Sequence, residues 1–505
     1  MQQLSKIFAL PVSPAIALAK AGLSAHGLTK AGLFAVVLSF FGLTAHAQDT
    51  WSLERCIQYA KDNNITVKQA QANVRTAMLS EKQAKASRLP NVSANANVGE
   101  QFGRTIDPTT NQFSTVATSF NSLGLNAGIN LFSGGLINHS IKQAGWDLQA
   151  ASADAEQLVN NLGLQIASAY LSILLGEEQL ENAGKRIQQT QEQLNVTMKL
   201  IDGGTLPMAD KYNILAQLAQ GEQAAVQARN SVELAYLSLK QLLQLEPDFD
   251  LRIDRPDVSI PVEANPDALS LSPVYQTAVN TQANIRAADF RVNSARESIA
   301  IAKSAYYPTI SAYANLSSSY SSQARDFNNP IIGDPVLGTP EIVNIGGQDI
   351  PVSYYYIPVT FPKTTYFDQI DQNFGQGIGA SIQIPIYQNG RTRLNVERAR
   401  LGVLTSQMQQ IQTQQLLKND IQTAIANARA ARLTLEAAQK TFDATEIAYQ
   451  NTVKRHTLGT INTLDLTTAR NNRDIAETDR TVAKYDYIFK LKILDFYLGK
   501  PLNMD

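Results

Sequence analysis

Residues 203–210 read GGTLPMAD, and residues 458–465 read LGTINTLD. Each octet holds a Gly-Thr pair, and in each an aspartate follows the threonine by five positions. Asp210 and Asp465 are therefore 255 positions apart. Glycine commonly ends a helix, and an acidic residue is favourable in the first turn of the next one. The two octets predict two matching turns, each of which joins a pair of helices.

The same separation of 255 positions extends upstream of the octets. It relates an aromatic pair and a glycine pair: Phe132 with Tyr387, and Gly135 with Gly390. The distance from the aromatic residue to the aspartate is thus the same in both copies, without an insertion or a deletion. A globular core does not require helices of fixed length, whereas a tube that crosses a fixed distance does. We infer an internal duplication in which helix length itself is constrained.

Each copy is predicted to contain one shorter helix and one long helical hairpin, because these segments are rich in Ala, Gln, Leu, Lys and Arg. The shorter helices are expected over 53–89 and 271–307, and the hairpins over 136–246 and 391–498. At ~1.5 Å per residue, the first helix of each hairpin would reach about 100 Å. Its glycine should end that helix, and the threonine should cap the next one. The hairpin tips, at 203–206 and 458–461, are Gly203, Gly204, Thr205, Leu206, Leu458, Gly459, Thr460 and Ile461.

Four segments between the helices alternate apolar with small polar residues. They lie at about 91–98 and 122–131 in the first copy, and at about 309–316 and 377–384 in the second. A period of two with one apolar face is typical of the strands of a membrane β-barrel. A half-buried hairpin of a soluble protein would explain any one segment, but four segments at equivalent positions favour the barrel.

Aromatic residues are found where these strands meet the helices: Phe132, Tyr306, Tyr307 and Tyr387. A girdle of aromatic side chains at the membrane–water interface would place them there. Ordinary core packing explains any single one of them equally well.

Four strands imply that several chains share one barrel. Open strand edges cannot face lipid, because no water is present there to satisfy their hydrogen bonds. The smallest bacterial barrels have about eight strands. Two copies would give eight strands and a filled lumen, whereas three copies would give twelve strands and an open bore. Repeat 1 would span 48–246, an irregular linker 247–270, and repeat 2 would span 271–505.

The N-terminus predicts export through a cleaved signal peptide over residues 1–47. Lysines precede an apolar run over 31–44, which is followed by Ala45-His46-Ala47. A transmembrane anchor is the alternative, but the run is shorter than the ~20 residues that a spanning helix needs. No segment after residue 47 reads as apolar enough to cross a membrane as a helix.

Composition argues against several classes of protein. The chain has 43 Lys and Arg against 44 Asp and Glu, so nothing favours a nucleic-acid partner. Cys56 is the only cysteine, which leaves no disulfide framework and no Cys-rich metal site, and we expect it to be buried on a helix face. No catalytic set, cofactor motif or phosphate-binding loop is apparent, so we expect no enzyme. A structural coiled-coil protein of the periplasm remains the alternative of a different class.

In its duplicated order of helix, strand, strand and long hairpin, the chain resembles the TolC family of outer-membrane efflux channels. The motifs that carry the resemblance are Leu458-Gly459-Thr460 with Asp465, and Gly204-Thr205 with Asp210. The resemblance implies a homotrimer in the outer membrane of a diderm bacterium, with a 12-stranded barrel and a 12-helix periplasmic tunnel. It also implies docking to a periplasmic adaptor that is driven by an inner-membrane pump. Type I protein secretion is a second role within transport.

For the site, the resemblance implies that the hairpin tips form the periplasmic entrance and contact the adaptor. Asp465, with Asp210 as its counterpart, would line the constriction. Stabilisation of a helix N-terminus is the alternative role for either aspartate. Two positions depart from the family pattern. Thr468 stands where a relative has a second acidic ring. Ile461 stands where that relative has an arginine that stabilises the closed state, so such stabilisation is not expected from this position.

Overall fold

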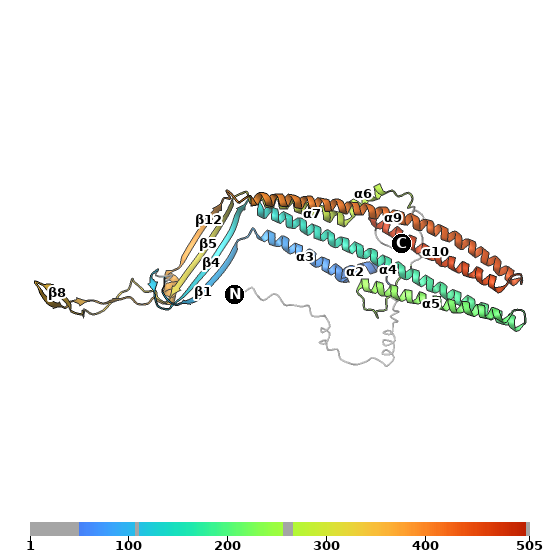
Figure 1. The fold of residues 1–505 in the computed structure, drawn as a ribbon, viewed down its shortest axis with the longest axis horizontal. Coiled ribbons are helices and arrows are strands. Elements are labelled where there is room, and N and C mark those ends of the chain that lie inside the picture. The colour runs from blue at the N-terminus through green and yellow to red at the C-terminus, as the bar shows by residue number, and fades with distance from the viewer. Residues whose placement is uncertain (1–49, 107–110, 256–265, 501–505) are drawn as a thin grey trace, which may run out of the picture. The chain divides into compact units, whose positions relative to one another are not determined.

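The computed structural model describes residues 50–106, 111–255 and 266–500 (Figure 1). The chain divides into two units, Met1–Thr50 and Trp51–Asp505. The helices and strands described below belong to the second unit. The predicted signal peptide lies outside the described residues.

Four antiparallel strands form one sheet in the order β1, β4, β5, β12. Their bounds are Asn91–Gln101 for β1, Thr118–Ser133 for β4, Thr309–Ser321 for β5 and Gly375–Gln383 for β12. β1, β4 and β5 extend beyond the predicted segments. The prediction was too short because the outer ends of these strands lack the regular alternation of apolar and polar residues. β1 and β12 are the two edges of this sheet, as Figure 1 shows.

The register of the sheet separates an apolar face from a polar face. Apolar side chains meet across the strands, with Ala94 opposite Leu125 and Leu125 opposite Leu316. On the other face, polar side chains bond across the strands, and Asn126 Nδ2 donates to Asn95 Oδ1 at 3.0 Å. A sheet with these two faces suits a wall that has lipid on one side and water on the other.

Helices continue from the strands in the same order. Their bounds are Leu53–Asn63 for α2, Ile65–Ala86 for α3, Leu136–Asp202 for α4, Met208–Leu243 for α5, Leu271–Thr281 for α6, Ala283–Ser304 for α7, Arg391–Thr457 for α9 and Thr463–Tyr497 for α10. α3 packs on α4, α4 on α7, and α7 on α9. The helix order α3, α4, α7, α9 thus repeats the order of the strands to which these helices connect. Further along, α5 packs on α4, α4 on α10, and α10 on α9 (Figure 1).

The single helices expected over 53–89 and 271–307 are wrong, because each is broken into two. Asn64 separates α2 from α3, and Gln282 separates α6 from α7. Both residues have extended backbone, with ψ of 130° and 126°. The two breaks are 218 positions apart, the same separation as that of the prolines before β1 and β5.

Each break is tied to the end of a hairpin by a side-chain amide. Asn64 Nδ2 donates to Leu242 O at 2.9 Å, at the C-terminal end of α5. Gln282 Nε2 donates to Phe496 O at 3.4 Å, at the C-terminal end of α10. Carbonyls at a helix end lack a helical partner, and the amide of Asn64 satisfies that of Leu242. The Phe496 carbonyl also accepts from Gly499 N at 3.1 Å, so the amide of Gln282 is its second donor. Asn64 has a local role as well, because its side chain caps α3 by accepting from Thr66 N at 2.8 Å.

The first core cluster surrounds the middle of α4, where Ile166, Tyr170 and Ile173 are fully buried. Tyr170 Oη donates to Asp254 O at 2.6 Å and so fixes the start of the linker to the core. Cys56 is buried on α2 as expected, and burial raises the pKa of its thiol to about 12. The thiol therefore stays protonated and acts as a small apolar group.

The expectation that no later segment could cross a membrane as a helix is wrong for α4. One window of α4 is apolar and long enough by composition, and half of that window is buried inside the fold. α4 packs against α5 and α7, and the buried apolar residues near its middle belong to the first core cluster. The apolar residues of α4 thus serve the core of the helical layer.

The longer of the two strand-linking loops, between β5 and β12, forms three two-stranded ladders and one short helix, α8 (Tyr366–Gln372). The ladders pair β6 with β11, β7 with β10, and β8 with β9. Their bounds are Ile331–Ile332, Val336–Leu337, Glu341–Ile345, Gln348–Val352, Tyr355–Tyr356 and Val359–Thr360 for β6 to β11. The shorter loop, between β1 and β4, holds the ladder of β2 (Thr105–Ile106) and β3 (Phe113–Ser114).

Candidate entrance at the hairpin tips

The first hairpin tip follows α4 and is closed by backbone and hydroxyl donors. Gly204 has a φ of 73°, a left-handed conformation that residues with a Cβ rarely adopt. Thr205 N donates to Leu200 O at 2.9 Å, and Thr205 Oγ1 donates to the same oxygen at 2.7 Å. This six-to-one bond with glycine at the left-handed position is a Schellman helix end.

The second tip, after α9, has the same geometry. Gly459 has a φ of 71°, and both Thr460 N and Thr460 Oγ1 donate to Arg455 O, at 3.0 and 2.9 Å. The expectation that threonine caps the following helix is therefore wrong at both tips. Its hydroxyl instead donates to a carbonyl at the end of the preceding helix, the same carbonyl that accepts from the threonine N–H.

The two tips differ in how the next helix begins. Asn462 is the N-cap of α10, and its side chain accepts a hydrogen bond from Asp465 N at 2.8 Å. Pro207 precedes α5 and gives no side-chain cap. Asparagine is among the strongest capping residues, so α10 begins with a stabilised first turn that α5 lacks.

The two aspartates lie in the first turns of different helices, Asp210 in α5 and Asp465 in α10. Asp465 is exposed and Asp210 is half-buried. Within the described part of the chain, neither carboxylate forms an ion pair. Each hairpin therefore carries one uncompensated negative charge just past its tip.

The remaining tip residues are exposed or half-buried. Leu458 is largely exposed, and Leu206 and Ile461 are half-buried. A Cβ added at Gly204 or Gly459 would meet no atom within 4 Å. The glycines are thus needed for backbone conformation and leave their surroundings free.

A charge cluster that the sequence did not indicate links the two hairpins. We call Arg186, Glu446, Arg473, Asp474 and Glu477 the inter-hairpin cluster. Arg473 Nε donates to Glu446 Oε2 at 2.8 Å, and its Nη1 lies 3.1 Å from both Asp474 Oδ1 and Glu477 Oε2. From α4, Arg186 Nε lies 3.5 Å from Asp474 Oδ2. Asp474 is only 8% exposed, so the cluster is largely shielded from water.

Arg186 also bonds α10 through groups outside the carboxylates. Its Nη2 donates to Thr478 Oγ1 at 2.8 Å and to the backbone carbonyl of Asp474. On α9, the hydrogen bonds from Arg473 and Gln450 hold the pKa of Glu446 below its ordinary value of 4.5. The i,i+4 spacing of Arg473 and Glu477 was the one local signal, because the other partners lie far apart in sequence.

The four aromatic residues predicted for an interface lie at or beside the ends of strands. Phe132 is the second-last residue of β4, Tyr306 and Tyr307 lie between α7 and β5, and Tyr387 lies between β12 and α9. All four are exposed, and Tyr387 is the most exposed at 81%. None is a core residue of this chain, which leaves them available to contact a bilayer.

An exposed apolar stripe runs along the outer face of α9. It consists of Leu394, Leu401, Leu404, Met408 and Ile411, all about half exposed or more. These residues are seven, three, four and three positions apart, so they share one face of the helix. α9 packs on α7 and α10, and this stripe remains without a partner in the described chain.

The sequence profile of outer membrane efflux proteins matches residues 56–244 and 274–500, which is most of the chain. The chain belongs to the outer membrane efflux protein family. The two matched segments coincide with the two structural repeats and leave out the linker between α5 and α6. Members of this family are channels rather than enzymes.

Relatives and solved structures agree with this membership. The outer membrane efflux protein BepC of Brucella suis biovar 1 is 21% identical over 454 residues, which cover 90% of this chain and 86% of BepC. The outer membrane protein TolC of Escherichia coli K12 is 23% identical over 228 residues, 44% of this chain and 46% of TolC. The crystal structure of the outer membrane protein VceC from Vibrio cholerae matches with a TM-score of 0.68 at 17% identity, covering 89% of this chain and 97% of VceC. The predicted family and its mainly helical fold with a β domain are confirmed.

Proposed function

We propose that this efflux-family chain forms one third of a passive exit duct in the outer membrane of a diderm bacterium. The duct would receive substrates from a periplasmic adaptor and an inner-membrane pump and carry them outside. The observation that carries the proposal is that the strand layer and the helix layer end at matching edges. β1 and α3 lie at one edge, and β12 and α9 lie at the other.

Matching edges favour a closed ring of copies. The edges of β1 and β12 cannot remain unpaired in lipid, so β12 of one copy would pair with β1 of the next. The apolar stripe of α9 would then pack on the α3 of the neighbour, whose Ile65 and Leu79 are also exposed. Three copies would supply twelve strands, enough for an open bore.

In such a trimer, the hairpin tips would form the periplasmic entrance. Three copies of Asp465 would place a ring of negative charge at the constriction, with Asp210 beside it, and would attract cations. The exposed tip backbone around Gly204 and Gly459 would give the adaptor a close approach. The chain itself would do no chemistry, so the pump would supply the energy and select the substrate.

Reconstitution in planar bilayers tests the duct. We expect small cation-selective currents from a heat-resistant trimer of the outer-membrane fraction. Asp465→Ala should raise the conductance and weaken the selectivity, because the narrow charged ring is removed. Asp443→Ala, which removes an exposed carboxylate from α9 away from the tip, should change neither. Equal behaviour of the two variants would contradict the entrance assignment, and a soluble monomer would contradict the channel.

The description of BepC as an outer membrane efflux protein favours a role in efflux over protein secretion for this chain. Deletion of the chain should therefore raise the sensitivity of the cell to toxic small compounds. Loss of a secreted protein without any change in sensitivity would favour type I secretion instead.

A further inference from the structure

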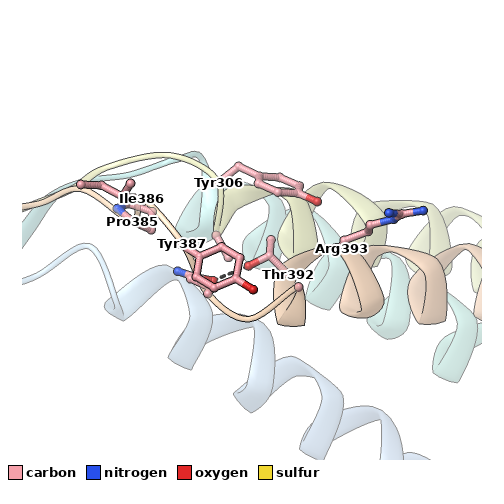
Figure 2. A pocket seen from close by; sticks show the side chains of 9 residues that line it. Tyr306, Pro385, Ile386, Tyr387, Thr392 and Arg393 are labelled. Carbon is pink, nitrogen blue, oxygen red and sulfur yellow. Dashed lines mark hydrogen bonds between the residues drawn. The ribbon is translucent and has the colours of Figure 1, made fainter.

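A pocket of about 190 Å³ lies where β12 leads into α9. Its walls come from two connections of the same chain, the α7–β5 turn and the β12–α9 segment. Figure 2 shows Tyr306 on one side and Tyr387 on another, with Thr392 and Arg393 from the first turn of α9. The pocket is walled by connections of one chain and lies beside the β12 and α9 edge at which copies would meet.

The polar part of the pocket carries an uncompensated positive charge. Arg393 is exposed and forms no ion pair or hydrogen bond with its side chain among the described residues. Glu397, one turn further along α9, is bonded to Arg400 instead, at 2.7 Å. Thr392 is buried and donates its hydroxyl to Gln388 Oε1, so it is already satisfied. Arg393 therefore supplies the charged free donors of the pocket, beside the hydroxyls of Tyr306 and Tyr387.

The apolar part of the pocket continues the apolar face of the sheet. Ile386 lines the pocket and is 95% exposed. Within β12, Ile378 and Ile382 are also exposed and share one face of the strand. Ile378 pairs with Ala314 in the register of the sheet, which places it on the apolar face. Ile384, which is exposed as well, lies in the segment that connects this apolar face to Ile386.

The duplication provides an internal comparison for this pocket. In repeat 1, the positions of Tyr306 and Arg393 are occupied by Arg88 and Asn138, at separations of 218 and 255. There, Arg88 Nη2 donates directly to Asn138 Oδ1 at 2.8 Å. The arginine of repeat 1 is thus satisfied within the chain, whereas the arginine of repeat 2 is left without a partner beside an open pocket.

We propose that the repeat 2 pocket binds the phosphate of an anionic phospholipid. Arg393 would donate to the phosphate oxygens, for which the guanidinium fork is suited. The tyrosines would lie at the headgroup level, and an acyl chain would follow the isoleucine stripe. This proposal rests on the proposed embedding of the sheet in the outer membrane.

Native mass spectrometry of the purified full-length trimer in detergent tests the pocket. The probes are phosphatidylglycerol, which is anionic, and phosphatidylcholine, which has the same phosphate but no net charge. We expect phosphatidylglycerol to bind more tightly, and Arg393→Gln to lower its affinity by about tenfold. Arg398→Gln is the matched control, because Arg398 is exposed on the same helix and bonds Asn395 at 3.2 Å.

A double substitution that keeps the net charge distinguishes specific binding at the pocket from nonspecific electrostatic attraction to an anionic lipid. The double variant Tyr306→Arg with Arg393→Asn reproduces the pair of repeat 1 and keeps the net charge. We expect it to lose phosphatidylglycerol to the same extent as Arg393→Gln. Retention of binding in the double variant, or equal binding of the two lipids, would overturn the proposal. Glycerol phosphate that bound as tightly as phosphatidylglycerol would also overturn it, because the acyl chain would then contribute nothing.

Failure of the membrane embedding and failure of the pocket assignment give different experimental results. If the sheet is not embedded, the protein would be a soluble particle that binds neither lipid. If the sheet is embedded but the pocket assignment is wrong, the trimer would bind lipid and Arg393→Gln would behave like Arg398→Gln.

Discussion

Asp474→Asn should loosen the contact between the two hairpins. The substitution keeps the size of the side chain and removes the negative charge that lies between two guanidinium groups. Arg186 would retain Thr478 and the backbone carbonyl of residue 474, but no carboxylate. Arg473 would retain Glu446 at 2.8 Å and Glu477 at 3.1 Å. The loss therefore falls mainly on the link from α4 to α10.

The magnitude follows from the burial of the pair. The Asp474 side chain is 11% exposed and that of Arg186 is 24% exposed, so screening by water is limited. Breaking a buried ion pair by removing one partner costs about 3–5 kcal/mol. The distance of 3.5 Å is long, and both arginines keep other partners, so we expect a cost below that range, about 2–3 kcal/mol. Because about 1.4 kcal/mol corresponds to a factor of ten, local opening should become about 30- to 140-fold more frequent.

Hydrogen exchange of the purified protein measures this opening. The amides of α10 near Asp474 and of α4 near Arg186 should exchange faster, and those of the sheet should not. Asp486→Asn is the control on the same helix, since Asp486 is half exposed and its partner Lys490 lies 3.6 Å away. Such a surface pair contributes about 0.5 kcal/mol. If Asp474→Asn exchanged no faster than Asp486→Asn, the cluster would not hold the hairpins together.

Three further perturbations test the tips and the inter-hairpin cluster. Gly459→Ala should lower the free energy of unfolding by about 1–2 kcal/mol, measured by thermal unfolding, because φ is 71° at this position. The control Gly402→Ala, inside α9 and with free space around it, should raise the free energy of unfolding by about 1 kcal/mol. Asn462→Ala should cost about 1 kcal/mol and raise exchange in the first turn of α10, where equal exchange would exclude a cap. Because the pKa of Glu446 is lowered, its contribution is present above pH 4.5 and is lost as the pH falls further, so Glu446→Gln should flatten the acid limb of a melting-temperature profile.

The repeat, the family and the general fold could be predicted because they depend on spacing and periodicity. The helix breaks were missed for different reasons. Asn64 left a local signal, because asparagine is a favoured N-cap and its side chain accepts from Thr66 N at 2.8 Å. Gln282 left no such signal, since its side chain gives no cap and bonds Phe496 O of another helix instead.

The candidate site also has features that local sequence predicted and features that it did not. The glycines of the tips were predicted from local chemistry, and their left-handed conformation agrees with that reasoning. The role of the threonine was predicted wrongly, because one hydroxyl can either cap the next helix or close the preceding one. The inter-hairpin cluster was missed because Arg186 and Asp474 are 288 positions apart, and only the packing of α4 on α10 brings them together.

Comparison of the two repeats separates what the fold requires from what a position adds. Both tips have the same backbone bonds although only Gly and Thr are shared between them, which indicates that the tip geometry itself is required. Where the geometry is free, each repeat has contacts that the other lacks. Repeat 2 has the side-chain cap at Asn462, whereas repeat 1 has Pro207 there. Repeat 1 in turn has side-chain caps at Ser52 and Asn64, where Ser270 and Gln282 provide none. The duplicated scaffold thus keeps its two longest helices at 67 residues each while the contacts at the helix ends differ between the repeats.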